Sequence, residues 1–233
     1  MVAMSFVRRL IGVLFTPRTA YADIVASPRS LVVLACVATA AAGSLYVFLS
    51  SEVGQEAYVD QRIRSVEAFG GEVTDAEYAA LKSASLSAAP RLAGTVFVAV
   101  PLAAILLSGS IVVASRFGSG APVTLARALG VVAHSGLVIA VWRLVSFPLD
   151  YGRRSMLGAT SLGALASFVD DTSPLARFLG TVDLFLVWWI LSLSIGVSVL
   201  LGRRARSVVG VALSIYAVAA LALTALTAVL GAE

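Results

Sequence analysis

Long apolar runs alternate with short charged segments along this chain, and the runs indicate its fold class. The clearest run ends at Leu201 and carries no formal charge from Leu184 onward. A helix of about 20 apolar residues crosses the ~30 Å hydrocarbon core of a bilayer. Runs of this kind cover residues 31–50, 92–115, 125–148, 178–201 and 207–230. We therefore predict an all-α, polytopic integral membrane protein, with a five-helix transmembrane bundle over residues 31–233.

Residues 1–30 precede the first run and predict a cytoplasmic, amphipathic leader that lies at the membrane interface. At helical spacing Val13 belongs to an apolar side, whereas Arg8 lies opposite and Arg9 at the flank. Basic amphipathic helices of this kind lie in the headgroup plane. A cleaved signal peptide is the rival interpretation, because residues 38–40 imitate a cleavage site. It fails because the charged leader is too long and the apolar run continues past that site.

Two hydrophilic segments, residues 52–91 and 150–173, predict helical loops on the outer side. In the first, a helix is expected to reach about Phe69 before Gly70-Gly71, and a second to begin at Thr74, where Thr74-Asp75-Ala76-Glu77 has the form of a capping box. In the second, we expect a short helix over residues 161–169. Ser173-Pro174 then resembles an N-cap followed by a first helical residue, so the fourth long helix should begin before its apolar part.

Composition agrees with lipid as the solvent of this protein. Of the 233 residues, 59% are hydrophobic and 13% are charged, whereas soluble domains average roughly 25% charged residues. The formal charge is +4, but the arginines flank apolar runs and do not line one polar face, so we expect no nucleic-acid partner. Cys36 is the only cysteine, which excludes an intramolecular disulfide and argues against a cysteine-based metal site.

The distribution of arginine predicts the orientation of the chain in a cell membrane. Basic residues collect before the first run and in alternate turns, while the segment 52–91 is predominantly acidic. The positive-inside rule then places the N-terminus in the cytoplasm and the C-terminus outside, which requires an odd number of spans. The topogenic arginines are Arg8, Arg9, Arg116, Arg127, Arg203, Arg204 and Arg206.

Three ionisable residues, His134, Arg143 and Asp183, fall within or near the predicted hydrocarbon, where a charge without a partner is costly. Arg143 and Asp183 lie at similar depths on antiparallel neighbours, so we predict an ion pair between them, with Asp150 as a candidate third member. A structural staple between two helices is favoured over a substrate or ion pathway. His134 lies nine positions from Arg143 and hence on the opposite face of the same helix.

The sequence contains no arrangement of residues that favours catalysis or cofactor binding. An intramembrane hydrolase would pair His134 with Ser192, Ser194 or Ser198, but helical serines usually bond to their own backbone or across an interface, and no nucleophile–base–oxyanion pattern is present. One histidine does not assemble a zinc site. The carboxylates of residues 52–91 lack the ligand spacing of a calcium loop. We therefore expect no enzyme activity, no cofactor and no metal.

The leader RLIGVLFTPRTAYADIVASPR, the entry Asp183-Leu184-Phe185 followed by Trp188, and the exit from Gly196 toward GRRAR resemble the prokaryotic branch of the YIP (Ypt-interacting protein) domain family of five-helix membrane proteins. Family members often carry a proline in the middle of the third span, where this chain has Ala133-His134-Ser135-Gly136. Eukaryotic relatives are associated with Rab-type GTPases, and some bacterial relatives resemble accessory subunits of ABC-type efflux transporters. The family supplies no catalytic residues.

The sequence thus favours a non-enzymatic membrane protein that acts as an interaction or accessory subunit of a membrane assembly, such as an efflux transporter. Its expected partners are the lipid bilayer and either another membrane protein or further copies of itself. The alternative is a small transporter or channel in which Arg143, Asp183 and His134 line a polar path.

Overall fold

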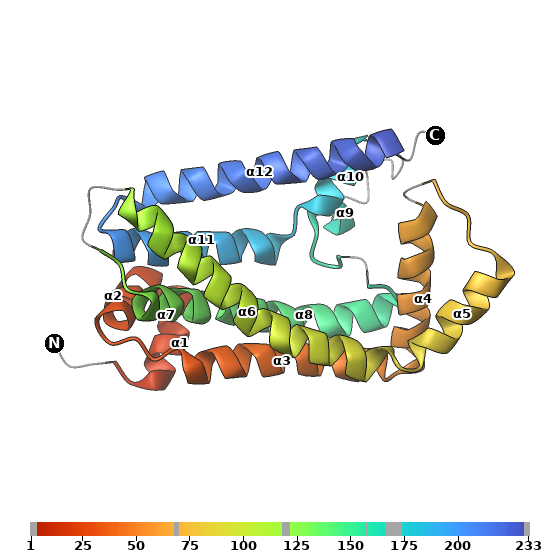
Figure 1. The fold of residues 1–233 in the computed structure, drawn as a ribbon, viewed down its shortest axis with the longest axis horizontal. Coiled ribbons are helices and arrows are strands. Elements are labelled where there is room, and N and C mark those ends of the chain that lie inside the picture. The colour runs from red at the N-terminus through yellow and green to blue at the C-terminus, as the bar shows by residue number, and fades with distance from the viewer. Residues whose placement is uncertain (1–3, 68–69, 118–121, 157, 166–173, 231–233) are drawn as a thin grey trace. The chain divides into compact units, whose positions relative to one another are not determined.

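The described part of the chain is helical, and no strand occurs in it. A computed structural model describes residues 4–67, 70–117, 122–156, 158–165 and 174–230. The helices are labelled in Figure 1. In chain order they are α1 (Phe6–Phe15), α2 (Pro17–Ala26), α3 (Leu31–Leu49), α4 (Glu52–Glu67), α5 (Asp75–Ser85), α6 (Ala88–Arg116), α7 (Leu125–Ser135), α8 (Leu137–Arg153), α9 (Leu162–Leu165), α10 (Pro174–Thr181), α11 (Leu184–Leu201) and α12 (Ala205–Leu230).

Within these residues five helical stretches are long and apolar enough to cross a membrane, which agrees with the predicted number. Each contains at least 18 residues, with few charges in its most apolar part. Such helices suit the hydrocarbon core because their backbone N–H and C=O groups form hydrogen bonds within the helix itself. The five are Leu31–Leu49, Ala88–Arg116, Leu125–Arg153, Leu184–Leu201 and Ala205–Leu226.

The chain divides into two compact units, each built from several separate stretches. Unit 1 comprises Met1–Ala41, Val96–Trp142 and Phe185–Ser214, and unit 2 comprises Ala42–Thr95, Arg143–Leu184 and Ile215–Glu233. The two units are described in turn.

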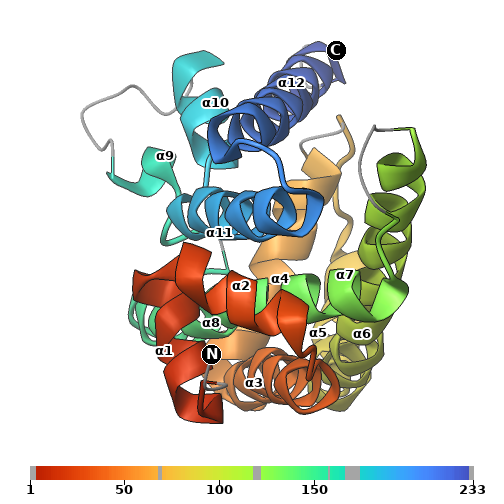
Figure 2. The same ribbon diagram turned by 90° about the vertical axis from the view of Figure 1, so that its left-hand side faces the viewer.

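In unit 1 the leader folds into two short helices that pack on each other and on α7, as Figure 2 shows for α1 and α2 in red. The Ser5 hydroxyl caps α1 by accepting a hydrogen bond from the Arg8 N–H, and Pro17 begins α2 at a position where a missing N–H costs nothing. Val13, Tyr21 and Ile24 are buried there. These leader residues therefore belong to the protein core.

The third predicted span consists of two helices, because α7 ends at Ser135 and α8 begins at Leu137. The hydrogen bonds from Gly136 N–H to the Val132 carbonyl and from Ala140 N–H to the Gly136 carbonyl keep the backbone satisfied across the break. A Cβ on Gly136 would lie 3.3 Å from a methyl group of Val37 on α3. The break thus coincides with a close approach of two helices in unit 1.

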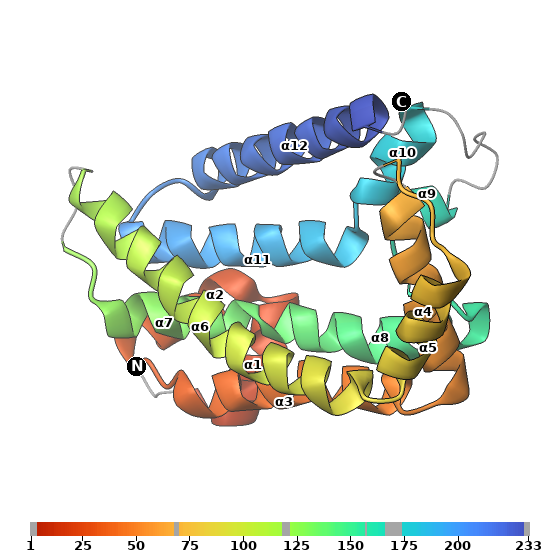
Figure 3. The ribbon, with the colours of Figure 1, turned by 45° about the vertical axis from the view of Figure 1, so that its right-hand side comes forward.

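In unit 2, α4 and α5 form a helical hairpin, seen in orange and gold in Figure 3. The capping box predicted at Thr74 is present: the Thr74 N–H donates to the Glu77 carboxylate, and the Glu77 N–H donates to the Thr74 hydroxyl. The predicted first helix ends at Glu67, and its expected end at Phe69 lies outside the described residues. The Thr74 N–H and the Thr74 hydroxyl both donate to the exposed Glu77 carboxylate and so lower the pKa of Glu77.

The fourth long helix is interrupted, which differs from the expectation of one helix beginning near Pro174. α10 ends at Thr181 and α11 begins at Leu184, because Asp183 leaves the helical path to form an isolated antiparallel bridge with Ser161. α9 packs beside α10 in the same unit. The predicted N-cap Ser173 and the end of the predicted helix over 161–169 lie outside the described residues.

Candidate functional site

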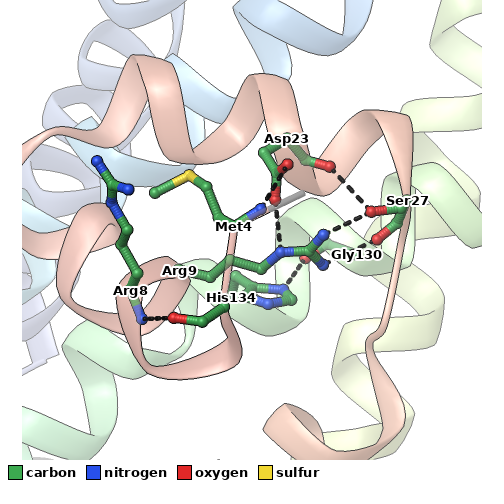
Figure 4. Close-up of polar contacts among 8 residues, drawn as sticks. Met4, Arg8, Arg9, Asp23, Ser27, Gly130 and His134 are labelled. Carbon is green, nitrogen blue, oxygen red and sulfur yellow. Dashed lines mark hydrogen bonds and ion pairs between the residues drawn. The ribbon is translucent and has the colours of Figure 1, made fainter. Parts of the chain in front are cut away.

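A buried polar cluster lies in unit 1 where the two leader helices meet (Figure 4). Arg9 on α1 is 3% exposed, and its Nε lies 2.6 Å from an oxygen of Asp23 on α2. The same guanidinium donates from Nη1 to the Ser27 carbonyl at 2.9 Å and from Nη2 to the Ser27 hydroxyl. The second Asp23 oxygen accepts from the Met4 N–H at 3.2 Å. Every nitrogen of the guanidinium is therefore occupied in joining α1 to α2.

His134 on α7 lies beside this cluster, close enough for an electrostatic interaction with Arg9. It is fully buried, and its Nδ1 donates to the Gly130 carbonyl at 2.8 Å. With the proton on Nδ1, Nε2 of the neutral ring is an acceptor. Nε2 has no hydrogen-bond partner within the described part of the chain. A neutral ring fits this place, because His134 is fully buried and a buried charge without a partner is costly.

A second buried contact joins the leader to α11. The hydroxyls of Tyr21 and Ser192 share a hydrogen bond of 2.8 Å. Burial raises the pKa of the Tyr21 hydroxyl well above its ordinary value, and the hydrogen bond to Ser192 offsets only part of this effect. Tyr21 is therefore a neutral phenol at physiological pH, and the contact positions α2 against α11.

The pairing of His134 with a serine on α11 that a hydrolase would need is not formed among the described residues. His134 bonds to Gly130, Ser192 bonds to Tyr21, and the Ser198 hydroxyl donates to the Ile195 carbonyl of its own helix at 2.7 Å. A hydrolase needs a base within hydrogen-bond reach of its nucleophile. The arrangement therefore lacks the first contact that the hydrolase hypothesis requires.

Asp183 occupies a different place, at the break between α10 and α11 in unit 2. Its carboxylate accepts a hydrogen bond from the Thr160 hydroxyl. Its backbone N–H donates to the Tyr216 oxygen at 3.3 Å, and the Tyr216 hydroxyl donates to the Thr181 carbonyl at 3.0 Å. The backbone bridge to Ser161 adds a further link. Asp183 thereby fastens the segment before α9 and the helix α12 to the start of α11.

Arg143 also belongs to unit 2, on α8. Its Nε donates to the Ser44 hydroxyl of α3 at 3.4 Å. Arg143 interacts electrostatically with Asp150, and Asp150 interacts in turn with Asp183. The structure thus gathers these three residues into one electrostatic neighbourhood, and a direct ion pair between Arg143 and Asp183 stays a prediction. His134 belongs to unit 1 and is not part of this group.

The predicted topogenic arginines differ in one respect. Arg9 is buried, whereas the others are exposed. Sequence reasoning missed the ion pair of Arg9 with Asp23. The available signal was the opposite charge of two residues in neighbouring short helices. The exposed arginines are Arg8, Arg116, Arg127, Arg203, Arg204 and Arg206.

No cluster of three or more potential metal ligands occurs among the described residues. Comparison of the chain with protein-family models, curated proteins and solved structures finds no match. The resemblance to the YIP family consequently rests on the sequence alone, that is, on the motifs of the leader and the fourth span and on the five predicted spans with a cytoplasmic N-terminus.

Proposed function

We propose that this chain is a non-enzymatic, multi-pass membrane protein of the YIP type that acts as an interaction or accessory subunit of a membrane assembly, such as an efflux transporter. The observation that carries the proposal is the exposed apolar surface of two long helices. Only 11% of the most apolar stretch of α6 is buried, and only 6% of that of α12, compared with 44% for α3. Water does not tolerate contiguous apolar faces of this size, whereas lipid and partner helices do.

The leader supports a place at the cytoplasmic surface of the plasma membrane. On α1 the buried side carries Arg9 and Val13, while Val7, Ile11 and Phe15 are 62%, 54% and 77% exposed. These three residues recur every four positions and so form one apolar stripe. An amphipathic helix of this kind inserts its apolar face at the boundary of headgroups and acyl chains. In this proposal α1 rests on the membrane with its stripe in lipid and with Arg9 and Val13 against the protein.

Several glycines on the long helices favour association with a partner helix or with a second copy. A Cβ built on Gly94 or Gly109 of α6, or on Gly210 of α12, would meet no atom within 4 Å. Small residues let helix backbones approach closely in lipid, where packing and not water exclusion drives association. Gly94, Gly109 and Gly210 thus leave room for a second helix against the two helices that expose the most apolar surface.

The contacts of the intramembrane polar residues support an accessory role over the alternative of a transporter or channel. Asp183 is hydrogen-bonded to Thr160 and linked through its backbone to Ser161 and Tyr216. His134 is bonded to the carbonyl of its own helix. The contacts of Asp183 join separate segments of the chain, and the ring of His134 is held by its own helix. Both sets of contacts favour a structural role over a polar path.

Purification of the tagged full-length chain in mild detergent tests the proposal. We expect a stoichiometric second membrane protein or a homo-oligomer, identified by mass spectrometry and by light scattering after gel filtration. Gly109→Leu should weaken that association if α6 is the contact helix, whereas Val113→Leu, one turn away and 54% exposed, should not. A strictly monomeric particle without a partner would contradict the proposal.

A further inference from the structure

A basic groove lies between the α4–α5 hairpin and the first turn of α6 in unit 2. Its volume is about 640 Å³. Its walls combine two arginines and two hydroxyl groups with apolar side chains. The groove is defined here by Tyr58, Arg62, Ser65, Leu81, Arg91 and Leu92.

The positive charge of the groove is not balanced by an acidic residue in its lining. No carboxylate lines it, although the surrounding segment 52–91 is rich in acidic residues. Neither Arg62 nor Arg91 forms an ion pair within the described residues, where the ion pair found in unit 2 joins Arg154 to Glu56. Two guanidinium groups thus line one groove without a carboxylate among its lining residues, which makes the groove attractive to an anion.

The orientation of Arg62 is partly fixed in advance. Its Nε donates to the Tyr58 hydroxyl at 3.4 Å, and its guanidinium carbon lies 5.7 Å from the centre of the Tyr58 ring. Tyr58 is itself buried. A side chain held in place before binding loses less conformational entropy when a ligand arrives.

The chemistry of these groups selects a phosphate. A guanidinium presents several N–H donors in a planar fork that matches phosphate oxygens, and hydroxyl groups add further donors. The apolar side chains Leu81 and Leu92 lie beside the arginines, which suits a ligand that is charged at one end and apolar at the other.

Arg91 and Leu92 belong to the first turns of α6, the helix Ala88–Arg116 that is long and apolar enough to span a bilayer. If α6 crosses the bilayer, its first turns lie at the depth of the lipid headgroups.

We propose that this groove binds the phosphate of an anionic phospholipid headgroup through Arg62 and Arg91. The inference rests on the proposed function, in which α6 spans a membrane, and goes beyond it by assigning a lipid-binding site. A soluble phosphate shares the same chemistry but would make no use of Leu81 and Leu92.

Native mass spectrometry of the full-length protein in detergent tests the proposal with dioleoyl phosphatidylglycerol and dioleoyl phosphatidylcholine as probes. We expect the anionic lipid to bind roughly tenfold or more tightly than the zwitterionic one, and Arg62→Gln with Arg91→Gln to abolish this difference. Arg64→Gln with Lys82→Gln removes the same amount of charge from the α4–α5 hairpin, at positions outside the groove. That control should keep the preference.

Equal loss of preference in both double variants would overturn the proposal in favour of general charge attraction. If inorganic phosphate displaced the lipid at a similar concentration, the groove would be a site for soluble phosphate, and the assignment to a lipid headgroup would be wrong. Should the Gln pair misfold, judged by circular dichroism and gel filtration, Arg62→Lys with Arg91→Lys keeps the charge and should weaken binding severalfold. A protein that stays in the membrane and retains its partner but shows no lipid preference refutes the groove alone and leaves the accessory role standing.

Discussion

At the scale of single residues, two ion pairs among the described residues show how burial decides what an ion pair contributes to stability. Arg9 and Asp23 are 3% and 12% exposed and lie 2.6 Å apart. Arg154 and Glu56 are 69% and 66% exposed and lie 4.0 Å apart. The buried pair lies among apolar leader residues where water cannot replace a lost partner, whereas both members of the exposed pair can be solvated.

We predict that Asp23→Asn destabilises the protein by about 3–5 kcal/mol, because it leaves Arg9 buried without a counter-charge. Glu56→Gln is the matched control, since it removes one carboxylate charge from an exposed pair, and it should cost at most about 1 kcal/mol. Thermal unfolding of both variants in the same detergent provides the measurement. Equal shifts in melting temperature would show that the leader cluster carries no special stability.

Single residues also show where sequence reasoning ends. The pattern predicted Arg9 as a topogenic charge at the flank of an amphipathic helix, and the structure gives it an additional buried role. The helix α1 is apolar on more than one side, so its periodicity does not reveal which face meets protein. The partners of Tyr21 and Asp183 were not predictable either, because Ser192 and Thr160 lie far away in the sequence and only the fold brings them close.

At the scale of elements, structure that depends on a few consecutive residues could be predicted from the sequence, and structure that depends on distant segments could not. The capping box of α5 lies within four consecutive residues, and its hydrogen bonds form as the sequence indicated. The break at Gly136 lies against Val37 of α3, and Asp183 leaves the helical path where it bridges to Ser161, so both interruptions involve residues distant in the sequence. Apolar runs predicted that these spans exist, but they carry no information about such interruptions.

The capping box predicts a pH dependence of α5. The pKa of Glu77 is lowered by the hydrogen bonds from Thr74, so its contribution to stability is complete above the ordinary glutamate pKa and is lost as the pH falls through the lower, folded value. Hydrogen exchange of the α5 amides should therefore show protection that decreases in this acidic range. Glu77→Gln should be less protected at neutral pH and should converge with the wild type in acid. Protection that does not change with pH would contradict a charged cap.

Helix packing in unit 1 depends on the absence of a side chain at Gly196 on α11. A Cβ there would lie 2.5 Å from a methyl group of Val131 on α7 and 3.0 Å from the ring of Tyr21 on α2. Valine in a helix has one strongly preferred rotamer, so its methyl group does not move aside easily. The glycine therefore allows α11 to approach both α2 and α7.

We predict that Gly196→Ala destabilises the protein by about 1–3 kcal/mol through overpacking. Gly210→Ala on α12 is the control, because nothing lies within 4 Å of an added Cβ there. That control should be stabilising by about 0.5–1 kcal/mol, the usual advantage of alanine within a helix. If both substitutions stabilise the protein in detergent unfolding, the close approach of α11 to Tyr21 and Val131 is wrong.

At the scale of the whole molecule, charge and span count together imply a topology that one experiment can check. Three of the candidate spans lie between Glu72 and Ser207, and an odd number of crossings places those two residues on opposite sides of a membrane. The arginines around Ser207 favour the cytoplasm for that side under the positive-inside rule. Parity and charge are independent inferences, so each can fail without the other.

We predict that a membrane-impermeant maleimide labels Glu72→Cys in intact cells, whereas Ser207→Cys reacts only after permeabilisation. Both substitutions are made in a Cys36→Ala background, because Cys36 is the only native thiol and is exposed in the structure. Ser207 is chosen over Arg203 because its replacement leaves the topogenic arginines intact. Labelling of Ser207→Cys alone in intact cells would show that the predicted orientation is reversed, and it would leave the odd number of crossings standing. Equal labelling of the two in intact cells would refute the odd number of spans between them, and the five-span topology with it.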